Sequence, residues 1–208
     1  MRLLLTSNGF FNDVIKGEFL KLIKCESNDL SVAIITTASP LKENNRFAQK
    51  AKEDFKEMGF TKIDFIDIEF DDPKRLLFKD VIYINGGNPY HLLFHFKKSG
   101  ADIILQNLVK KNIVIVGVSA GALLLGPNIK VVEFFTPQMD AFDTEDFSAL
   151  NLTDKLVFPH YDQEDLFRDY SNKTIEERLK EFEVAESCEV TRLKDDEFIA
   201  IQNKIRDV

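Results

Sequence analysis

Residues 113–126, IVIVGVSAGALLLG, are the stretch that decides the predicted fold. The first half, residues 113–118, is apolar and β-branched, which is typical of a strand buried on both faces, and the small and apolar residues that follow predict a helix. Between them stands Gly117-Val118-Ser119-Ala120-Gly121, a G-x-S-x-G motif. Glycines on both sides of Ser119 let strand and helix approach closely while the serine is held exposed, so the motif predicts a nucleophile elbow at the carboxyl end of a strand. The plainer alternative is a small-residue turn in which Ser119 caps the helix.

Strand patterns alternate with helix patterns along the first half of the chain. The predicted strands cover residues 2–6, 32–37, 61–66, 81–85 and 113–118, and the predicted helices cover 13–23, 44–58 and 101–110. This alternation predicts an α/β fold of three layers, with a mostly parallel central sheet and helices on both faces. Sites in such sheets lie at the carboxyl ends of the strands, which is where Ser119 stands.

The second half of the chain departs from this alternation. Residues 129–147 combine aromatic, proline and acidic residues, and we expect them to form loops beside the site. A strand ending in VFPH at 157–160 and a helix at about 174–182 follow, and residues 190–193 and 198–201 predict a hairpin around the acidic turn 194–197. No linker composition interrupts the chain, so we expect one domain over residues 1–208.

Composition limits the kinds of partner that the protein is expected to bind and the compartment in which we expect it. Of the 208 residues 44% are hydrophobic and 30% charged, and the formal net charge of −8 argues against nucleic acid or an anionic membrane as a partner. The apolar run at the N-terminus is too short for a secretory signal and no stretch is long enough to span a membrane, so we expect a cytoplasmic protein. Cys25 and Cys188 lie far apart without ligand-like spacing, which predicts two free thiols.

The chain contains three histidines. His160 follows Pro159 at the end of an apolar strand, the same kind of position as Ser119, and is the best candidate for a general base. His91 and His95 are spaced i, i+4 on the helix that opens at Asn88-Pro89, with His91 expected at the edge of the site. A zinc site of that spacing normally includes a glutamate, as in HExxH, and a third ligand, and the sequence shows neither, so we expect no metal.

A second glycine segment, YINGGNP at residues 83–89, ends another buried strand. A backbone N–H of this segment and the N–H of Ala120 are candidates for an oxyanion hole. The pattern is not a phosphate-binding loop, because neither glycine-rich nucleotide motif is present. The acid that would orient the base stays open at this point, with Glu133, Asp140, Asp143, Asp195 and Asp196 all available.

Taken together, these motifs resemble peptidase family S51, the serine peptidases that include the aspartyl dipeptidases and cyanophycinase. The matching segments are YINGGNPYHLL at 83–93, GVSAGALLLGP at 117–127, FSALNL at 147–152, FPHYD at 158–162, TIEERLKEF at 174–182 and LKDDEFIAI at 193–201. The resemblance implies that Ser119 is the nucleophile, His160 the base, and Gly87 and Ala120 the oxyanion donors. It also implies that Asp195 completes the triad, with Asp196 and Glu133 as the alternatives.

The resemblance also carries expectations about the substrate. It implies hydrolysis of dipeptides or short peptides through an acyl-enzyme, without a cofactor, and we expect Asn88 and Arg178 to contact the substrate. Ile175 stands where an aspartyl dipeptidase is expected to have an arginine that binds the substrate's aspartate, so aspartyl specificity is an open expectation. The alternative functions are an esterase or amidase of the same architecture, or a binding protein that keeps a peptidase-like pocket.

Overall fold

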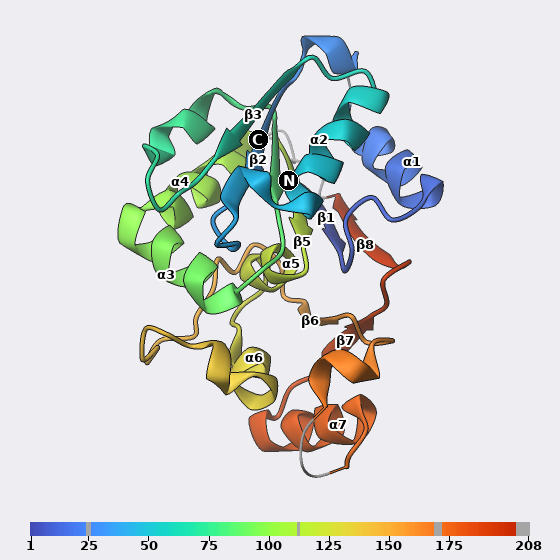
Figure 1. Cartoon of the computed structure of the whole chain (residues 1–208), viewed down its shortest axis with the longest axis vertical. Coiled ribbons are helices and arrows are strands. Elements are labelled where there is room, and N and C mark those ends of the chain that lie inside the picture. The colour runs from blue at the N-terminus through green and yellow to red at the C-terminus, as the bar shows by residue number, and fades with distance from the viewer. Residues whose placement is uncertain (24–25, 112, 169–171, 203–208) are drawn as a thin grey trace, which may run out of the picture.

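The computed structural model describes residues 1–23, 26–111, 113–168 and 172–202. At its centre lies a six-stranded sheet in the order β3-β2-β4-β5-β1-β8, in which only β8 runs antiparallel to its neighbour (Figure 1). The strands are β1 (Arg2–Thr6), β2 (Ser31–Ile35), β3 (Lys62–Ile66), β4 (Val81–Ile84), β5 (Val114–Val118) and β8 (Phe198–Gln202). The predicted strands of the first half therefore all form, and they pair in parallel as expected.

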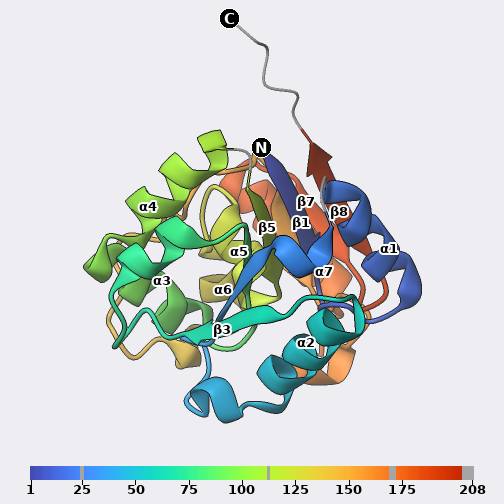
Figure 2. The ribbon, with the colours of Figure 1, turned by 90° about the horizontal axis from the view of Figure 1, so that it is seen from above.

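Helices cover both faces of this sheet. Figure 2 shows α1 (Asp13–Leu22) and α2 (Arg46–Glu57) on one side, with α3 (Pro89–Ser99) and α4 (Ala101–Leu108) on the other. Along β2, Val32 and Ile34 belong to the core under α1 and α2, whereas Ala33 and Ile35 belong to the core under α3, α4 and α5 (Ala120–Leu125). Because successive side chains of a strand point to opposite faces, an all-apolar strand supplies both cores. The three-layer α/β fold is confirmed.

A smaller sheet lies at one end of the central one (Figure 1). It consists of β6 (Leu156–Pro159) and β7 (Val190–Leu193), which pair in parallel, and α6 (Lys130–Phe135) and α7 (Ile175–Glu186) lie beside it. The predicted hairpin is wrong, because β7 pairs with β6 while β8 pairs with β1 in the central sheet. The turn after Leu193 does form, with the Glu197 N–H donating to the Lys194 carbonyl at 3.1 Å, but it carries the chain from one sheet to the other.

Short 3₁₀ segments join the main elements. They are η1 (Ser27–Asp29), η2 (Lys42–Asn44), η3 (Pro73–Phe78), η4 (Val109–Lys111), η5 (Pro137–Met139) and η6 (Glu164–Phe167). The stretch expected to be loops, residues 129–147, contains α6 and η5, because Val131, Val132 and Phe135 repeat at helical spacing and are buried.

The structure tests the expectations of two free thiols and of no membrane-spanning segment only in part. Cys188 has a free thiol, and Cys25 lies outside the described residues. Among the residues that the structure describes, no helix is both long and apolar enough to cross a bilayer.

Candidate active site

The carboxyl ends of β1, β4 and β5 meet at one edge of the central sheet. Thr6 pairs with Val118 and Ile84 pairs with Gly117, so the residues that follow these strands lie next to one another. The amide of Ser119 donates to the Thr6 carbonyl at 3.0 Å. Strand register alone therefore brings Ser119 beside the polar residues that follow β1 and the glycines that follow β4.

Ser119 occupies a strained turn between β5 and α5. Its φ of 50° and ψ of −109° are unusual for a residue with a side chain. The turn is possible because Gly121 packs against β4, where a Cβ on Gly121 would lie 2.2 Å from the Ile84 carbonyl oxygen, and a Cβ on Gly117 would lie 2.7 Å from the Gly121 carbonyl oxygen. Close backbone contacts thus require glycine at both ends of the G-x-S-x-G motif. The Ser119 hydroxyl lies just beyond the carboxyl end of β5.

The hydroxyl of Ser119 begins a chain of close polar contacts. Its Oγ lies 3.0 Å from Nε2 of His160, and Nδ1 of His160 lies 2.7 Å from Oδ1 of Asp195. The side chains of His160 and Asp195 are 23% and 15% exposed, so both groups are largely withdrawn from water. This order of groups is the one in which a base can accept a serine proton while a carboxylate stabilises the resulting imidazolium.

His160 and Asp195 come together because β6 and β7 are parallel. Pro159 pairs with Leu193, so the residues just after the two strands lie at the same edge of the small sheet. The Asp195 amide also donates to Oδ1 of Asp162, at 3.2 Å, which helps to hold the turn. The placement of Asp195 therefore follows from the parallel pairing and not from a hairpin.

The other candidate acids lie elsewhere. Asp196, Glu133 and Asp143 are exposed. Asp140 accepts hydrogen bonds from the amides of Phe142 and Thr144 in its own loop. Burial raises the pKa of Asp140, but these hydrogen bonds outweigh it and lower the pKa overall. None of these four carboxylates has a hydrogen bond to His160 within the described part of the chain.

Ser7 is a member of this network that sequence reasoning missed. Its hydroxyl donates to Oδ1 of Asp195 at 2.8 Å and accepts the backbone N–H of His160 at 2.7 Å. Asn8 adds a longer bond, 3.3 Å, from its side-chain amide to Oδ2 of Asp195. The available signal was the polar run Thr6-Ser7-Asn8 directly after β1, because all parallel strands end at the same edge of a sheet.

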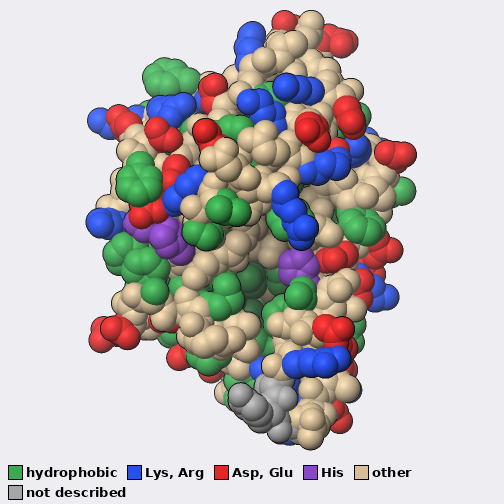
Figure 3. Space-filling view, viewed as in Figure 1, with side chains coloured by type: hydrophobic (Ala, Val, Ile, Leu, Met, Phe, Trp, Pro, Cys, Tyr) green, Lys and Arg blue, Asp and Glu red, His purple; other side chains and the backbone are tan. Residues whose placement is uncertain are grey.

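Two cavities meet at the Ser119 hydroxyl. Ser119, His160 and Gly87 line both of them, and Ala120 lines the second. Figure 3 shows a hollow on this face, with hydrophobic side chains inside it and histidine at its edge. Each cavity, at about 420 Å³ and about 350 Å³, lies at the small end of the range for small-molecule sites.

The first cavity has polar and charged side chains at its wall. These include Asn8, Asn12, Asn45, Lys16, Lys50 and Asp54. Lys16 pairs with Asp54 at 2.7 Å, and hydrogen bonds to this carboxylate and to Glu57 raise the pKa of Lys16. Burial raises the pKa of Tyr83, whose ring also lines this cavity, so its hydroxyl stays protonated.

Asn85 offers an unused donor in the first cavity. The residue is 2% exposed, and its side-chain nitrogen has no hydrogen-bond partner among the described residues. Buried polar groups nearly always have a partner, in the protein, in ordered water or in a ligand. The amide of Asn85 is therefore a candidate contact for a bound polar group.

The second cavity is apolar. Its wall is formed by Leu123, Val131, Val132, Phe135, Met139, Phe158 and Phe167, and among the described residues no Asp, Glu, Lys or Arg lines it. The aromatic rings pack on one another, with centroids 4.4 Å apart for Phe135 and Phe158 and 4.8 Å apart for Phe158 and Phe167. A site of this kind accepts an apolar group more readily than a charged one.

Gly87 joins the two cavities. Its φ is 143°, and a Cβ at this position would lie 2.2 Å from the Ala38 carbonyl oxygen. Only glycine can therefore adopt this backbone conformation. The segment also lies close to Ser119, since a Cβ on neighbouring Gly86 would lie 3.1 Å from the Ser119 Cβ.

Comparison with known proteins decides the family. Residues 3–207 match the model of peptidase family S51. The chain belongs to peptidase family S51. Membership of this family, together with relatives named peptidase E, supports a peptidase.

Relatives and solved structures agree with this assignment. The chain is 28% identical over 151 residues to the uncharacterised peptidase Lmo0363 of Listeria monocytogenes, a match that covers 71% of this chain and 73% of that protein. It is 33% identical over 137 residues to the uncharacterised peptidase PM1590 of Pasteurella multocida, with 63% and 65% covered. For peptidase E of Escherichia coli O1:K1 / APEC the identity is 30% over 102 residues, which span 49% of this chain and 42% of the relative.

The fold is shared with a crystal structure of a candidate peptidase E protein from Listeria monocytogenes EGD-e. The TM-score is 0.77 at 26% identity, with 98% of this chain and 95% of that chain covered. A peptidase from an acI-B1 Actinobacterium has the same fold at a TM-score of 0.61 and 17% identity, with 82% and 72% covered.

Two residues that the S51 resemblance implied for substrate binding, Asn88 and Arg178, line neither cavity. The Asn88 side chain caps α3, where it accepts the amides of Tyr90 and His91, and its nitrogen donates to the Met139 carbonyl at 2.8 Å. Its polar atoms are thus already bonded within the protein, and Asn88 lines neither cavity. These bonds tie the residue that follows Gly87 to the start of α3 and to Met139.

Arg178 is the second of these residues. It is 5% exposed, its guanidinium donates to the Phe167 carbonyl at 2.6 Å and lies over the Phe135 ring, and it lines neither cavity. It supports the wall of the apolar cavity from behind. Ile175, at the position expected to bind an aspartate, is 1% exposed and is part of the hydrophobic core.

Proposed function

We propose that this chain is a cytoplasmic serine peptidase that hydrolyses dipeptides or short peptides. The Ser119 hydroxyl attacks the scissile carbonyl, and Nε2 of His160 takes its proton. The carbon–nitrogen bond breaks as His160 returns that proton to the leaving amine, which gives an acyl-enzyme. Water, activated by His160, then cleaves the Ser119 ester and regenerates the free hydroxyl. Side chains and water supply every proton in this sequence.

The observation that carries the proposal is the continuous contact from Asp195 through His160 to Ser119. The distances of 2.7 Å and 3.0 Å are within hydrogen-bonding range at both ends of one imidazole. With Nδ1–H donating to Asp195, Nε2 is left as the acceptor that faces Ser119. Asp195 thereby fixes the tautomer that the reaction needs.

For the oxyanion we propose the backbone N–H groups of Gly87 and Ala120. Gly87 borders both cavities at Ser119, and Ala120 is the first residue of α5, directly after the serine. An N–H that follows a nucleophile and one from a neighbouring loop form the usual pair of donors in strand–turn–helix hydrolases.

The two cavities favour a particular substrate class. The apolar cavity, with Phe135, Phe158 and Phe167 in its wall, suits an apolar side chain of the substrate. Among the described residues no Lys or Arg lines this cavity, and Arg178 donates to backbone carbonyls behind its wall, so an aspartate side chain there would lose its hydration without gaining a cation from them. The polar cavity suits the charged end of a short peptide, with Asn85 and Lys50 as contacts. We therefore propose an apolar-residue preference in place of aspartyl specificity.

A labelling experiment tests the mechanism. A fluorophosphonate probe should modify the wild-type chain on one tryptic peptide containing Ser119, and Ser119→Ala should remove that label. Ser7→Ala is the matched control, because it removes another serine of the same site and should keep the label. A wild-type chain that folds but takes no label, or a label that survives in Ser119→Ala, contradicts the proposal.

A substrate panel tests the class. Dipeptides with Leu, Phe or Asp as the first residue, compared with simple aryl esters, separate a peptidase from an esterase of the same architecture. We expect kcat/KM for the leucyl and phenylalanyl peptides to exceed that for aspartyl peptides by at least about 100-fold, since an unpaired buried charge costs several kcal/mol. Turnover of esters alone would favour the esterase, and absence of any turnover despite Ser119 labelling would oppose peptide hydrolysis.

A further inference from the structure

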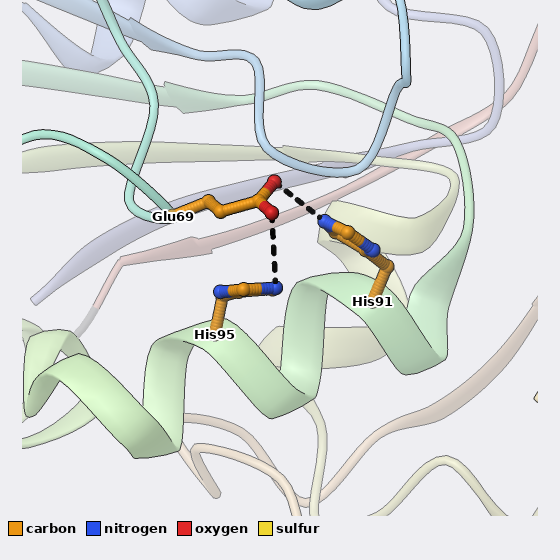
Figure 4. Close-up of side chains that lie close together, drawn as sticks. All are labelled: Glu69, His91 and His95. Carbon is orange, nitrogen blue, oxygen red and sulfur yellow. Dashed lines mark hydrogen bonds and ion pairs between the residues drawn. The ribbon is translucent and has the colours of Figure 1, made fainter. Parts of the chain in front are cut away.

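A second group of chemically active side chains lies beside α3, apart from the Ser119 site. His91 and His95 stand one turn apart on this helix, and both rings face the carboxylate of Glu69, which belongs to the connection between β3 and η3 (Figure 4). Histidine also appears at two separate places on the face seen in Figure 3, on either side of the hollow. None of these three residues lines either active-site cavity.

The three side chains converge on one point. Nε2 of His91 lies 3.0 Å from Oε2 of Glu69, and Nε2 of His95 lies 3.7 Å from Oε1 of the same carboxylate. The ring centroids of the two histidines are 4.4 Å apart, and one ligand atom from each of the three residues lies within 4.8 Å of the others. Donor atoms that share a metal at about 2.0–2.2 Å lie roughly 3–3.5 Å apart, so small side-chain rotations would bring all three into one coordination sphere.

Hydrogen bonding alone does not account for this arrangement. His91 makes a hydrogen bond to Glu69, but the 3.7 Å separation of His95 from the same carboxylate is too long for one. The His95 side chain is nevertheless 9% exposed, and it is buried with Nε2 directed at the group that His91 already binds. Two imidazole nitrogens directed at one carboxylate form a common ligand set for zinc.

An aromatic ring and a lysine border the cluster. The Phe142 ring packs against both histidine rings, at centroid distances of 5.5 Å and 6.0 Å, and it stacks on Phe94 at 4.2 Å. This aromatic cover lowers the local dielectric on one side, which strengthens any charge interaction in the cluster. On the other side the Lys42 ammonium contacts the same Glu69 carboxylate and lies 2.9 Å from Oδ2 of Asp67, so a metal ion at Glu69 would replace Lys42 there and leave it paired with Asp67.

We propose that Glu69, His91 and His95 form a binding site for a divalent transition-metal ion of the zinc class, with water as a fourth ligand. Two imidazole nitrogens and a single carboxylate favour zinc over magnesium or calcium, which prefer oxygen ligands. The ion ties the β3–η3 connection to α3, the helix that begins beside Gly87. It therefore stabilises the segment next to the active site and takes no part in the peptidase reaction.

The sequence alone predicted no metal here, because the i, i+4 histidine pair has no glutamate beside it in the helix to complete an HExxH pattern. The third ligand, Glu69, is 22 residues before His91 and reaches the helix only through the tertiary fold.

Zinc binding to the untagged, full-length chain tests the proposal. Equilibrium dialysis followed by metal analysis should find one zinc ion per chain, and isothermal titration should give the dissociation constant. Glu69→Gln and His95→Ala should each weaken binding by at least about tenfold. His160→Ala is the matched control, because it removes the third histidine of the chain and should leave zinc affinity unchanged. Cobalt bound in place of zinc should show the visible absorption of a four-coordinate ion in the wild type and not in Glu69→Gln.

Three outcomes would overturn the proposal. They are absence of stoichiometric zinc on the wild-type chain, unchanged affinity in both cluster variants, and loss of binding in His160→Ala. Circular dichroism shows whether each variant is folded, and the isosteric Glu69→Gln serves if His95→Ala is not. Because the readout is metal binding, the result does not depend on whether Ser119 is catalytic.

Discussion

Replacing Asp195 with Asn is the sharpest test of how the active site is assembled. The substitution keeps the size of the side chain, removes its charge and turns one of its two acceptor oxygens into an NH2 donor. In the structure Oδ1 of Asp195 lies 2.7 Å from Nδ1 of His160 and also accepts the Ser7 hydroxyl at 2.8 Å. Donors from Asn8 and Gln163 face Oδ2, so the asparagine nitrogen is opposed by donors there and is favoured at the Oδ1 position. From that position it would donate to Nδ1 of His160 and select the tautomer that carries its proton on Nε2.

The size of the effect follows from these contacts. When His160 becomes protonated during the reaction, its charge lies about 4 Å from that of the Asp195 carboxylate, which is worth about 4 kcal/mol at an effective dielectric of about 20. The exposures of 23% and 15% make that dielectric more suitable than the value for dry protein. At about 1.4 kcal/mol for each factor of ten, loss of the charge lowers kcat by about 10³-fold. The wrong tautomer adds to this, so we expect about 10³- to 10⁴-fold.

The assay is the hydrolysis of a leucyl dipeptide by Asp195→Asn beside Asp196→Asn. Asp196 is the exposed neighbour in the same turn, and its variant should keep at least half of the wild-type kcat. Denaturant unfolding should show both variants folded. If Asp195→Asn keeps more than about a tenth of the activity, or if Asp196→Asn loses as much, the proposed role of Asp195 is refuted.

Four further predictions follow from the same structure. Ser7→Ala should lower kcat about tenfold, because it removes a contact that positions Asp195; an unchanged kcat in steady-state assays would exclude that role. Gly87→Ala should fold and lose most activity, since its Cβ would lie 2.2 Å from the Ala38 carbonyl oxygen and displace the loop; a normal kcat/KM would contradict this. Arg192→Met should lower the free energy of unfolding by about 1–3 kcal/mol at pH 7, where Arg192 pairs with Glu183, and by less in acid. Hydrogen bonds from Arg192 hold the pKa of Glu183 below its ordinary value, so this contribution is complete above about pH 4.5 and is lost as the pH falls through the lowered pKa. Urea unfolding at several pH values would show this dependence. Dialysis against EDTA should leave kcat at 25 °C unchanged while lowering the melting temperature of zinc-loaded protein; lost activity that zinc restores would place a metal in the reaction.

Much of the fold could be predicted because the strands carry a strong local signal. The runs 32–35 and 114–118 are apolar on both faces, and such a run is stable only between two layers of helices. The exposed turn at Ser119 could also be predicted, because the small residues around it are required by the close contact of α5 with β4. Both signals are contained in a few consecutive residues, which is why the sequence pattern alone predicts these features.

The parts that were wrong or missing depend on pairing between distant segments. Residues 190–201 carry the local pattern of a hairpin, two short apolar runs around a tight acidic turn, but β8 gains a full antiparallel partner in β1 and β7 gains a parallel partner in β6. Long-range pairing therefore outweighs the local turn. Ser7 and Glu69 were missed for the same reason, because each acts on residues more than 20 positions away.

The corrected topology also explains how Asp195 reaches His160. A hairpin would have left Asp195 at an exposed tip, whereas the parallel pair of β6 and β7 ends both strands at one edge and places the two side chains together. The central sheet supplies Ser119, and Ser7 joins it to the small sheet through the His160 amide and the Asp195 carboxylate. The proposed triad is thus assembled across two sheets, so its geometry depends on how tightly they pack. Variants that loosen β7 from its neighbours should consequently reduce kcat even where they leave Ser119 and His160 unchanged.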